Sequence, residues 1–261
     1  MCNTMKLALI QAPADLGPPE ERLNWLDIKL TEISESAELV LLPELFACGY
    51  AIGAKINVYA EPRNGRIAAE LAGLALKHGI AVHCGYAERD GRTLYNSALC
   101  VGPDGKELSH QRKLAIPPGF ERTYFTAGKG CTLFTYRSFK IATLICYDAE
   151  FPETFRHVAA LGVDLVLVPT ALGACWGWVA ETMLPTRAYE NGLFLAYANS
   201  AGTQNEMKFL GKSVIAAPDG EELARAGRAP QILYAELDKS RVQAAQARLP
   251  YLIDRTHIQL N

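Results

Sequence analysis

The fold is decided by residues 140–153, which read KIATLICYDAEFPE. After Lys140, the next five residues are apolar or β-branched and predict a buried strand. A helix is predicted to follow at 154–161, so Cys146 stands at a strand-to-helix turn. Backbone N–H groups near a helix N-terminus favour a thiolate and later an oxyanion. Taken alone, Cys146 is still better interpreted as a small core residue beside a helix cap, because free cysteines usually pack.

A carboxylate follows a second buried strand in the segment LVLLPELF at 39–46. Four apolar residues predict the strand, Pro43 stops it, and Glu44 comes next. Ligands of open α/β sheets bind beyond the carboxyl ends of the strands. Apolar neighbours should disfavour the charged form of Glu44 and raise its pKa toward that of a useful base. Alternatively, Glu44 is only a helix-capping or solvated loop residue.

A cation follows a third strand-like segment, after the turn GPDG at 102–105. It is Lys113, in the run SHQRKL at 109–114. Alone, Lys113 would be a surface charge. A Glu, a Lys and a Cys in that order, each at the end of a strand, are much harder to explain by accident. The three motifs together therefore favour a catalytic thiol.

These motifs resemble those of the nitrilase superfamily, the carbon–nitrogen hydrolases with a Glu-Lys-Cys triad. The resemblance runs from Met5 to about Arg248. It also includes the segments YNSA (95–98), ERTYFTAG (121–128), RAYENG (187–192) and NSAG (199–202). It implies an α/β fold, a four-layer α-β-β-α sandwich, which is usually paired in a homodimer or a higher homo-oligomer. We expect both from this chain.

The resemblance also implies the roles of the triad. Amide and nitrile carbons need a nucleophile, a proton carrier and a stabiliser of negative charge. Cys146 would be the nucleophile and Glu44 the general base and acid. Lys113, with the backbone N–H of Tyr147, would hold the oxyanion. The residues at the three strand ends are Glu44, Lys113 and Cys146, with no histidine among them, so a Cys-His pair is the weaker model.

Further site residues are expected around the triad. Glu121 matches the family's second glutamate, which is thought to orient substrate and lysine. Its alternative is a loop carboxylate paired with Arg122. Tyr50, Tyr147 and Trp176 are candidate walls of a substrate-binding pocket, although each fits the core as well, because aromatic residues usually pack.

The nucleophile motif narrows the reaction. Nitrilases tend to carry Cys-Trp-Glu, whereas Cys146-Tyr147-Asp148 resembles the amidase branches, especially the aliphatic and stereoselective amidases. We expect a thiol amidohydrolase that cleaves a small aliphatic carboxamide to an acid and ammonia through a thioester. The alternatives are an ω-amidase, an N-carbamoyl amide hydrolase or a nitrilase with the same triad, or a catalytically silent binding relative. No motif shows an Arg or Lys placed to capture a substrate carboxylate.

The length, composition and charge of the chain limit which kinds of partner and which location are expected. The chain has 261 residues with 26 Lys and Arg against 28 Asp and Glu, a net charge of −2. We expect one domain over 1–261, with its core at about 5–248 and a tail at 249–261. The scattered charges argue against nucleic-acid and membrane-surface partners. The sequence lacks a run of 18 apolar residues and a secretory signal pattern, so a cytoplasmic location is expected.

The cysteines and histidines suggest no metal or cofactor. The seven cysteines form no C-x-x-C pair and stand at 2, 48, 84, 100, 131, 146 and 175. The five histidines are dispersed. Reduced thiols and no bound metal are the simplest account. Cys84, Cys100 and Cys131 should pack in strands, while Cys48 and Cys175 could approach the pocket.

Alternating strand-like and helix-like patterns complete the expectation. Strands are predicted at 6–12, 39–42, 80–88, 94–101, 107–114, 131–136, 140–145, 164–168, 193–199, 209–217 and 231–237. Helices are predicted from 18 onward and at 66–78, 154–161, 178–191 and 239–247.

Overall fold

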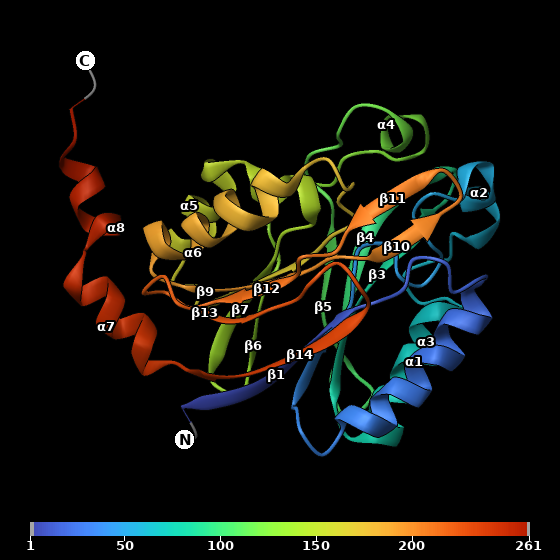
Figure 1. Cartoon of the computed structure of the whole chain (residues 1–261), viewed down its shortest axis with the longest axis horizontal. Coiled ribbons are helices and arrows are strands. Elements are labelled where there is room, and N and C mark those ends of the chain that lie inside the picture. The colour runs from blue at the N-terminus through green and yellow to red at the C-terminus, as the bar shows by residue number, and fades with distance from the viewer. Residues whose placement is uncertain (1–2, 260–261) are drawn as a thin grey trace.

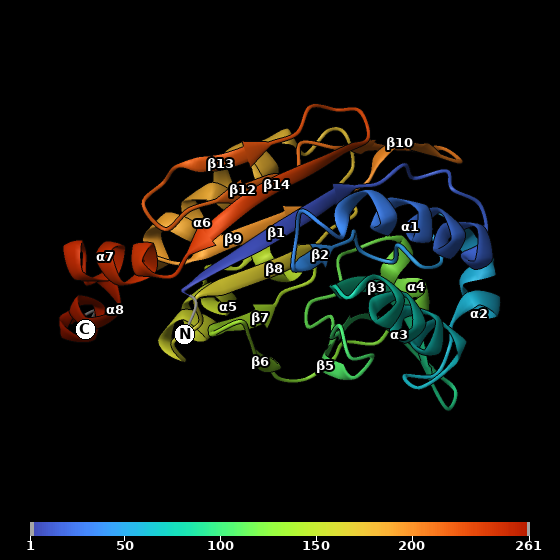
Figure 2. The same cartoon turned by 90° about the horizontal axis from the view of Figure 1, so that it is seen from below.

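Two six-stranded sheets face each other, and helices cover the outer face of each (Figures 1 and 2). The computed structural model describes residues 3–259. The first sheet has the order β14 (Gln231–Asp238), β1 (Thr4–Gln11), β2 (Leu39–Leu41), β3 (Ala81–Asp90), β4 (Thr93–Val101), β5 (Glu107–Arg112). The second has the order β13 (Glu222–Arg225), β12 (Val214–Ala216), β9 (Phe194–Ala198), β8 (Leu165–Pro169), β7 (Phe139–Thr143), β6 (Leu133–Tyr136). The expected α-β-β-α sandwich is confirmed.

Strand alternation explains the layers. Leu7 and Leu9 of β1 belong to the core between the sheets, whereas Ala8 and Ile10 pack beneath the helices. Successive side chains of a strand point to opposite faces, so apolar runs without polar alternation mark strands buried on both sides. Helices α1 (Pro19–Ile33) and α3 (Arg66–His78) cover the first sheet, and α5 (Pro152–Ala160) and α6 (Leu184–Asn191) cover the second.

The first and the last strand of the described chain pair in the first sheet. Strand β14 pairs antiparallel with β1, from Thr4 opposite Asp238 to Gln11 opposite Gln231. Helix α7 (Ser240–Arg248) follows β14. Then come α8 (Tyr251–Asp254) and the 3₁₀ helix η4 (Arg255–His257), and α8 packs against α5 and α6.

The predicted strand 209–217 is wrong. Its first part lies in β11 (Met207–Leu210), which forms a hairpin with β10 (Ala201–Gln204), and its last part is β12 of the second sheet. Gly211 and Lys212 separate them with φ angles of 68° and 58°. These left-handed conformations turn the chain out of one sheet and into the other.

The single helix predicted at 178–191 is also divided. A π-helical turn, η3 (Val179–Met183), precedes α6. Pro185 has no N–H to donate back into the preceding turn, and the carbonyl of Ala180 accepts a hydrogen bond from Arg225 Nη1 at 3.3 Å instead. The short elements that the sequence patterns did not predict are η1 (Gly53–Lys55), α2 (Ile56–Tyr59), α4 (Phe120–Tyr124), β10, β13, α8 and η4.

The cysteines of the described chain are all free thiols, whereas Cys2 lies outside the described residues. Cys84 and Cys100 are core residues, as predicted. Cys131 is only partly buried and precedes β6 instead of lying in it, which corrects its strand assignment.

Candidate active site

The three predicted triad residues stand where strands of the two sheets end. Glu44 follows β2 and Lys113 follows β5 in the first sheet, while Cys146 follows β7 in the second. The backbone N–H of Lys113 still donates to the carbonyl of Asn96 at 2.8 Å, which extends the β4–β5 pairing by one residue. The candidate site is therefore assembled from both sheets, beyond the carboxyl ends of their strands.

A buried lysine lies between two buried carboxylates. Lys113 Nζ is 2.6 Å from Glu44 Oε1, and it is 2.7 and 2.8 Å from the two carboxylate oxygens of Glu121. All three side chains are at most 1% exposed. Arg122 instead donates to the carbonyl of Ile116 at 3.2 Å. Glu121 is thus part of this trio, and the alternative of a loop carboxylate paired with Arg122 is wrong.

Asn96 belongs to the same cluster, although the sequence patterns did not single it out. Its Nδ2 donates to Glu44 Oε1 at 2.7 Å and to Glu121 Oε2 at 3.0 Å. In the sequence, only its place in the segment YNSA pointed to Asn96. Its role depends on the pairing of β4 with β5, which brings Asn96 opposite Lys113. Glu44 Oε2 and Asn96 Oδ1 remain buried with no hydrogen-bond partner.

Tyr50 is the predicted wall residue that reaches the trio. Its hydroxyl donates to Glu121 Oε1 at 2.7 Å, and its ring lies 5.3 Å from that of Phe120 and 6.1 Å from that of Phe209. Glutamate 121 therefore accepts bonds from a lysine, an amide and a phenol. Such a set of donors holds the carboxylate in one orientation.

The other two predicted wall residues lie differently. Tyr147 follows Cys146 in the chain, is partly exposed, and packs edge-on against Phe151 with the ring centroids 5.0 Å apart. Trp176 is 61% exposed in the loop between β8 and η3. In the same loop Cys175 is exposed, whereas Cys48 is fully buried.

The pKa values of Glu44, Lys113 and Cys146 are all raised above their ordinary values. Burial raises the pKa of Glu44 to about 7, although the Lys113 charge opposes this shift. Burial pushes the pKa of Lys113 down, but Glu44 and Glu121 outweigh it and the net shift is upward. Burial also raises the pKa of the Cys146 thiol, and Glu44 adds to the shift. At neutral pH the site holds a charged ammonium, a protonated thiol and a carboxylate that ionises near neutrality.

The backbone at both motif ends has uncommon geometry. Cys146 has a φ of 48° and Leu45, directly after Glu44, has a φ of 51°. Positive φ is rare for such residues and persists where the surrounding structure enforces it, often at functional sites. A Cβ on Gly85 would lie 2.5 Å from the backbone N of Leu45 and 2.8 Å from Cα of Glu44. Only glycine permits this close approach of β3 to the Glu44 turn.

Cys146 does not stand directly at the start of the predicted helix. It opens the 3₁₀ helix η2 (Cys146–Glu150), and α5 begins only at Pro152. The expected strand-to-helix turn is thus longer than the sequence pattern suggested. Asp148, within η2, accepts the backbone N–H groups of Leu114 and Ala115 at 3.0 and 2.7 Å. It joins the nucleophile turn to the chain after Lys113.

Two observations concern other kinds of site. Within residues 3–259, no group of three or more His, Cys, Asp or Glu side chains is arranged to hold a metal ion. Over the same range, none of the helices has the length and apolar character required to cross a bilayer.

Comparison with known proteins places this geometry in a family. The carbon–nitrogen hydrolase family model matches residues 6–247. A Pseudomonas protegens protein named "Hydrolase in pqqF 5'region" is 36% identical, covering 97% of this chain and 90% of its own. An (R)-stereoselective amidase of a Pseudomonas species is 32% identical over 96% and 91% of the two chains.

Solved structures give the same result. The crystal structure of an amidase from Nesterenkonia sp. superposes with a TM-score of 0.86 at 31% identity, over 99% of this chain and 98% of its own. A variant of that amidase carries the acetamide moiety of fluoroacetamide, added covalently at its active-site cysteine; it matches with a TM-score of 0.85 at 31% identity over 97% of both chains.

Proposed function

Because this chain belongs to the carbon–nitrogen hydrolase family, we propose that it is a thiol amidohydrolase that cleaves a small aliphatic carboxamide to a carboxylic acid and ammonia. The observation that carries the proposal is the buried Lys113 between Glu44 and Glu121, beside the thiol of Cys146. The similarity to amidases from Pseudomonas and Nesterenkonia supports an amide substrate.

The first half of the reaction forms a thioester. Cys146 Sγ attacks the amide carbon while Glu44 accepts the thiol proton. The carbonyl oxygen becomes an oxyanion, which Lys113 and the backbone N–H of Tyr147 stabilise. The intermediate collapses as Glu44 returns its proton to the nitrogen, so the C–N bond breaks and ammonia leaves.

The second half hydrolyses the thioester. A water molecule gives a proton to Glu44 as its oxygen attacks the acyl carbon, and the same donors hold the new oxyanion. When this intermediate collapses, the C–S bond breaks and the carboxylic acid forms. Glu44 returns the proton to the sulfur of Cys146, which restores the resting enzyme.

Glu44 suits this work better than Glu121. A pKa of about 7 allows Glu44 to accept and return a proton near neutral pH. Lys113 and Asn96 both bind its Oε1, so its unpartnered Oε2 is available to the thiol or to water. Glu121 has both oxygens engaged and instead orients Lys113.

The nucleophile is tested by replacing the thiol. Cys146→Ala should abolish ammonia release and leave folding intact, because a thiol at a strand end contributes little packing. Cys146→Ser should be nearly inactive as well, since Glu44 is too weak a base for an alcohol. The exposed Cys175, changed to Ala, is the matched control and should keep parental activity. Activity of Cys146→Ala within about tenfold of the parent would contradict the mechanism, since nucleophile removal costs far more.

Reaction choice is tested in the same assay. An amide intermediate expels ammonia once Glu44 protonates it, whereas a nitrile must first give a thioimidate that needs further proton transfers. A short carboxamide should therefore have a higher kcat/KM than the nitrile with the same carbon skeleton. Faster nitrile hydrolysis would assign the chain to nitrile chemistry with the same triad.

A further inference from the structure

Asp148 makes hydrogen bonds to both halves of the candidate site. Its side chain is fully buried. One oxygen, Oδ1, accepts the N–H groups of Leu114 and Ala115 at 3.0 and 2.7 Å, and Oδ2 accepts the N–H of Ile145 at 3.0 Å. Leu114 directly follows Lys113, and Ile145 directly precedes Cys146. One carboxylate thus joins the residue after the lysine to the residue before the thiol.

We propose that Asp148 is a positioning residue that sets the place of Lys113 relative to the thiol of Cys146. This inference rests on the proposed amidase function. The lysine belongs to the first sheet and the thiol to the second, so their relative position depends on how the two sheets are held together at this edge. The oxyanion must lie close to both groups, and a displacement of about 1 Å can cost around 10²-fold in rate.

Only a carboxylate fits these three donors. Ionised aspartate offers acceptors alone, whereas an asparagine amide would turn an NH₂ group toward at least one of the backbone N–H groups. Burial raises the pKa of Asp148 to about 6, while the charge of Lys113 and the backbone N–H groups oppose the shift. A pKa of about 6 leaves the carboxylate mostly ionised at neutral pH, and the charge of Lys113 acts on it.

The turn also contains a matched control. Thr154 Oγ1 donates to the backbone carbonyl of Asp148 at 2.6 Å and to that of Phe151 at 2.8 Å. Thr154→Val removes these bonds to the same turn and leaves the carboxylate bonds to Leu114, Ala115 and Ile145 in place. It measures what a local loosening of the turn does by itself.

The decisive experiment compares turnover with alkylation of the thiol. Attack of Cys146 on iodomethane, which has no carbonyl group, displaces iodide and builds no oxyanion, so it reports on the reactivity of the thiol without the oxyanion site. Amide turnover also needs Lys113 in place. Asp148→Asn should lower kcat by about 10²-fold with KM little changed, while the alkylation rate of Cys146 stays within about threefold. Thr154→Val should keep kcat within about threefold of the parent, because surface contacts away from the site contribute little.

Asp148→Glu is the conservative variant, and it decides the question even if the Asn variant does not fold. It keeps a carboxylate on an arm that is one methylene longer, so it should regain part of the lost turnover. The proposal fails if Asp148→Asn turns over within about threefold of the parent, or if turnover and alkylation fall together in both variants, as general damage would cause. Failure of the amidase function itself would look different, because the parent would then release no ammonia from short carboxamides, or Cys146→Ala would release it as fast as the parent.

Discussion

Two glutamates of the first sheet are equally buried and have opposite acidities. Glu44 and Glu88 are each only 1% exposed. The pKa of Glu44 is raised to about 7, and that of Glu88 is lowered to about 2. Burial by itself disfavours the charge of both carboxylates, so solvent exposure alone does not explain why the two pKa values move in opposite directions.

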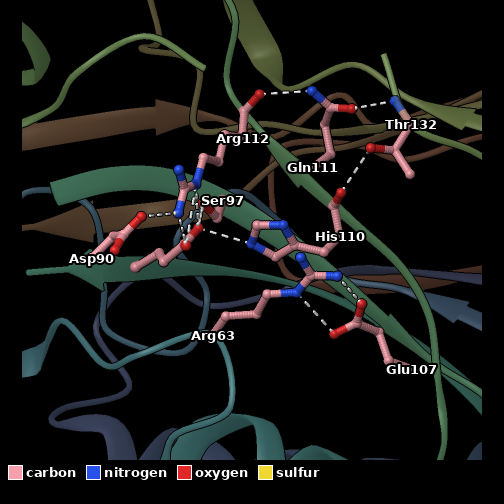
Figure 3. A network of polar contacts seen from close by, with 9 residues as sticks. Arg63, Asp90, Ser97, Glu107, His110, Gln111, Arg112 and Thr132 are labelled. Carbon is pink, nitrogen blue, oxygen red and sulfur yellow. Dashed lines mark hydrogen bonds and ion pairs between the residues drawn. The ribbon is translucent and has the colours of Figure 1, made fainter. Parts of the chain in front are cut away.

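The hydrogen-bond donors around each carboxylate explain the difference between the two pKa values. Three residues labelled in Figure 3, Ser97, His110 and Arg112, bind the carboxylate of Glu88, with Ser97 Oγ at 2.6 Å and His110 Nε2 at 2.8 Å. Arg112 Nε reaches both carboxylate oxygens at 3.1 Å. These hydrogen bonds outweigh the cost of burial. Glu44, in contrast, shares its lysine with Glu121 and has one oxygen unpartnered.

The two clusters lie back to back on the same strands. Ser97 pairs with Arg112 across β4 and β5, and the adjoining residues Asn96 and Lys113 are also hydrogen-bonded to each other. Adjacent strand residues point to opposite faces. One face of the sheet therefore holds a fully satisfied charge cluster, and the other holds an incompletely satisfied one. The comparison teaches that unsatisfied donors and acceptors, and not burial alone, distinguish a reactive carboxylate from a structural one.

The largest effect on activity is expected from a change at Glu44. Glu44→Gln keeps the shape and removes the proton carrier, so kcat/KM for the amide should fall by roughly 10²–10⁴-fold. Thermal unfolding should show a folded protein. Ammonia release measures the loss, and a decrease of less than about tenfold would show that another group carries the proton.

For Glu88, we expect a loss of stability with little change in activity. Glu88→Gln leaves the partly exposed Arg112 and the buried His110 with a weakened partner, which should lower the free energy of unfolding by about 1–3 kcal/mol. Turnover per folded molecule should change little. Urea unfolding measures the first quantity, and amide hydrolysis by the folded fraction measures the second.

Asp90→Asn is the matched control for that variant. Its carboxylate also binds Arg112, at 2.9 Å, but the side chain is 63% exposed. The cost should stay below about 1 kcal/mol, as for other exposed ion pairs. A cost as large as that of Glu88→Gln would show that the whole network, and not the buried carboxylate, supplies the stability.

A smaller effect separates the two carboxylates by pH. Glu44 must be ionised to accept the thiol proton, so kcat/KM should fall about tenfold per pH unit below its pKa of about 7. Glu88 has a lowered pKa, so its contribution to stability is complete above its ordinary value of 4.5 and is lost as the pH falls toward 2. At pH 5 the protein should be fully folded and at least about 10²-fold less active, because Glu44 and, below its pKa of about 6, also Asp148 are protonated. Unfolding that tracks the loss of activity between pH 7 and 5 would contradict this separation.

The sequence patterns predicted those features that depend on residues close together in the chain. Apolar runs placed Glu44 and Cys146 at strand ends, and the turn at 102–105 indicated the strand that precedes Lys113. Asn96 and Asp148 escaped prediction because their roles depend on neighbours far away in the chain: Asn96 pairs across the sheet, and Asp148 bonds between sheets. No local pattern carries that information.

The misplaced elements have a related cause. Residues 209–217 are apolar enough for one strand, and only the backbone conformation at Gly211 and Lys212 divides them between two sheets. Gly211 was the one visible signal of a break. Likewise, the helical pattern of 178–191 hid the effect of Pro185, since apolar periodicity continues through the π-helical turn.

The pairing of β14 with β1 has a consequence for synthesis on the ribosome. Residues 4–11 emerge long before residues 231–238, the strand that covers their open edge. Until that segment is made, β1 presents unpaired backbone groups on an apolar strand, the kind of edge that recruits other chains. Closing so long a loop is also slow compared with forming local contacts. The nascent chain therefore passes most of its elongation with this edge open, and chaperone protection is needed most in that interval.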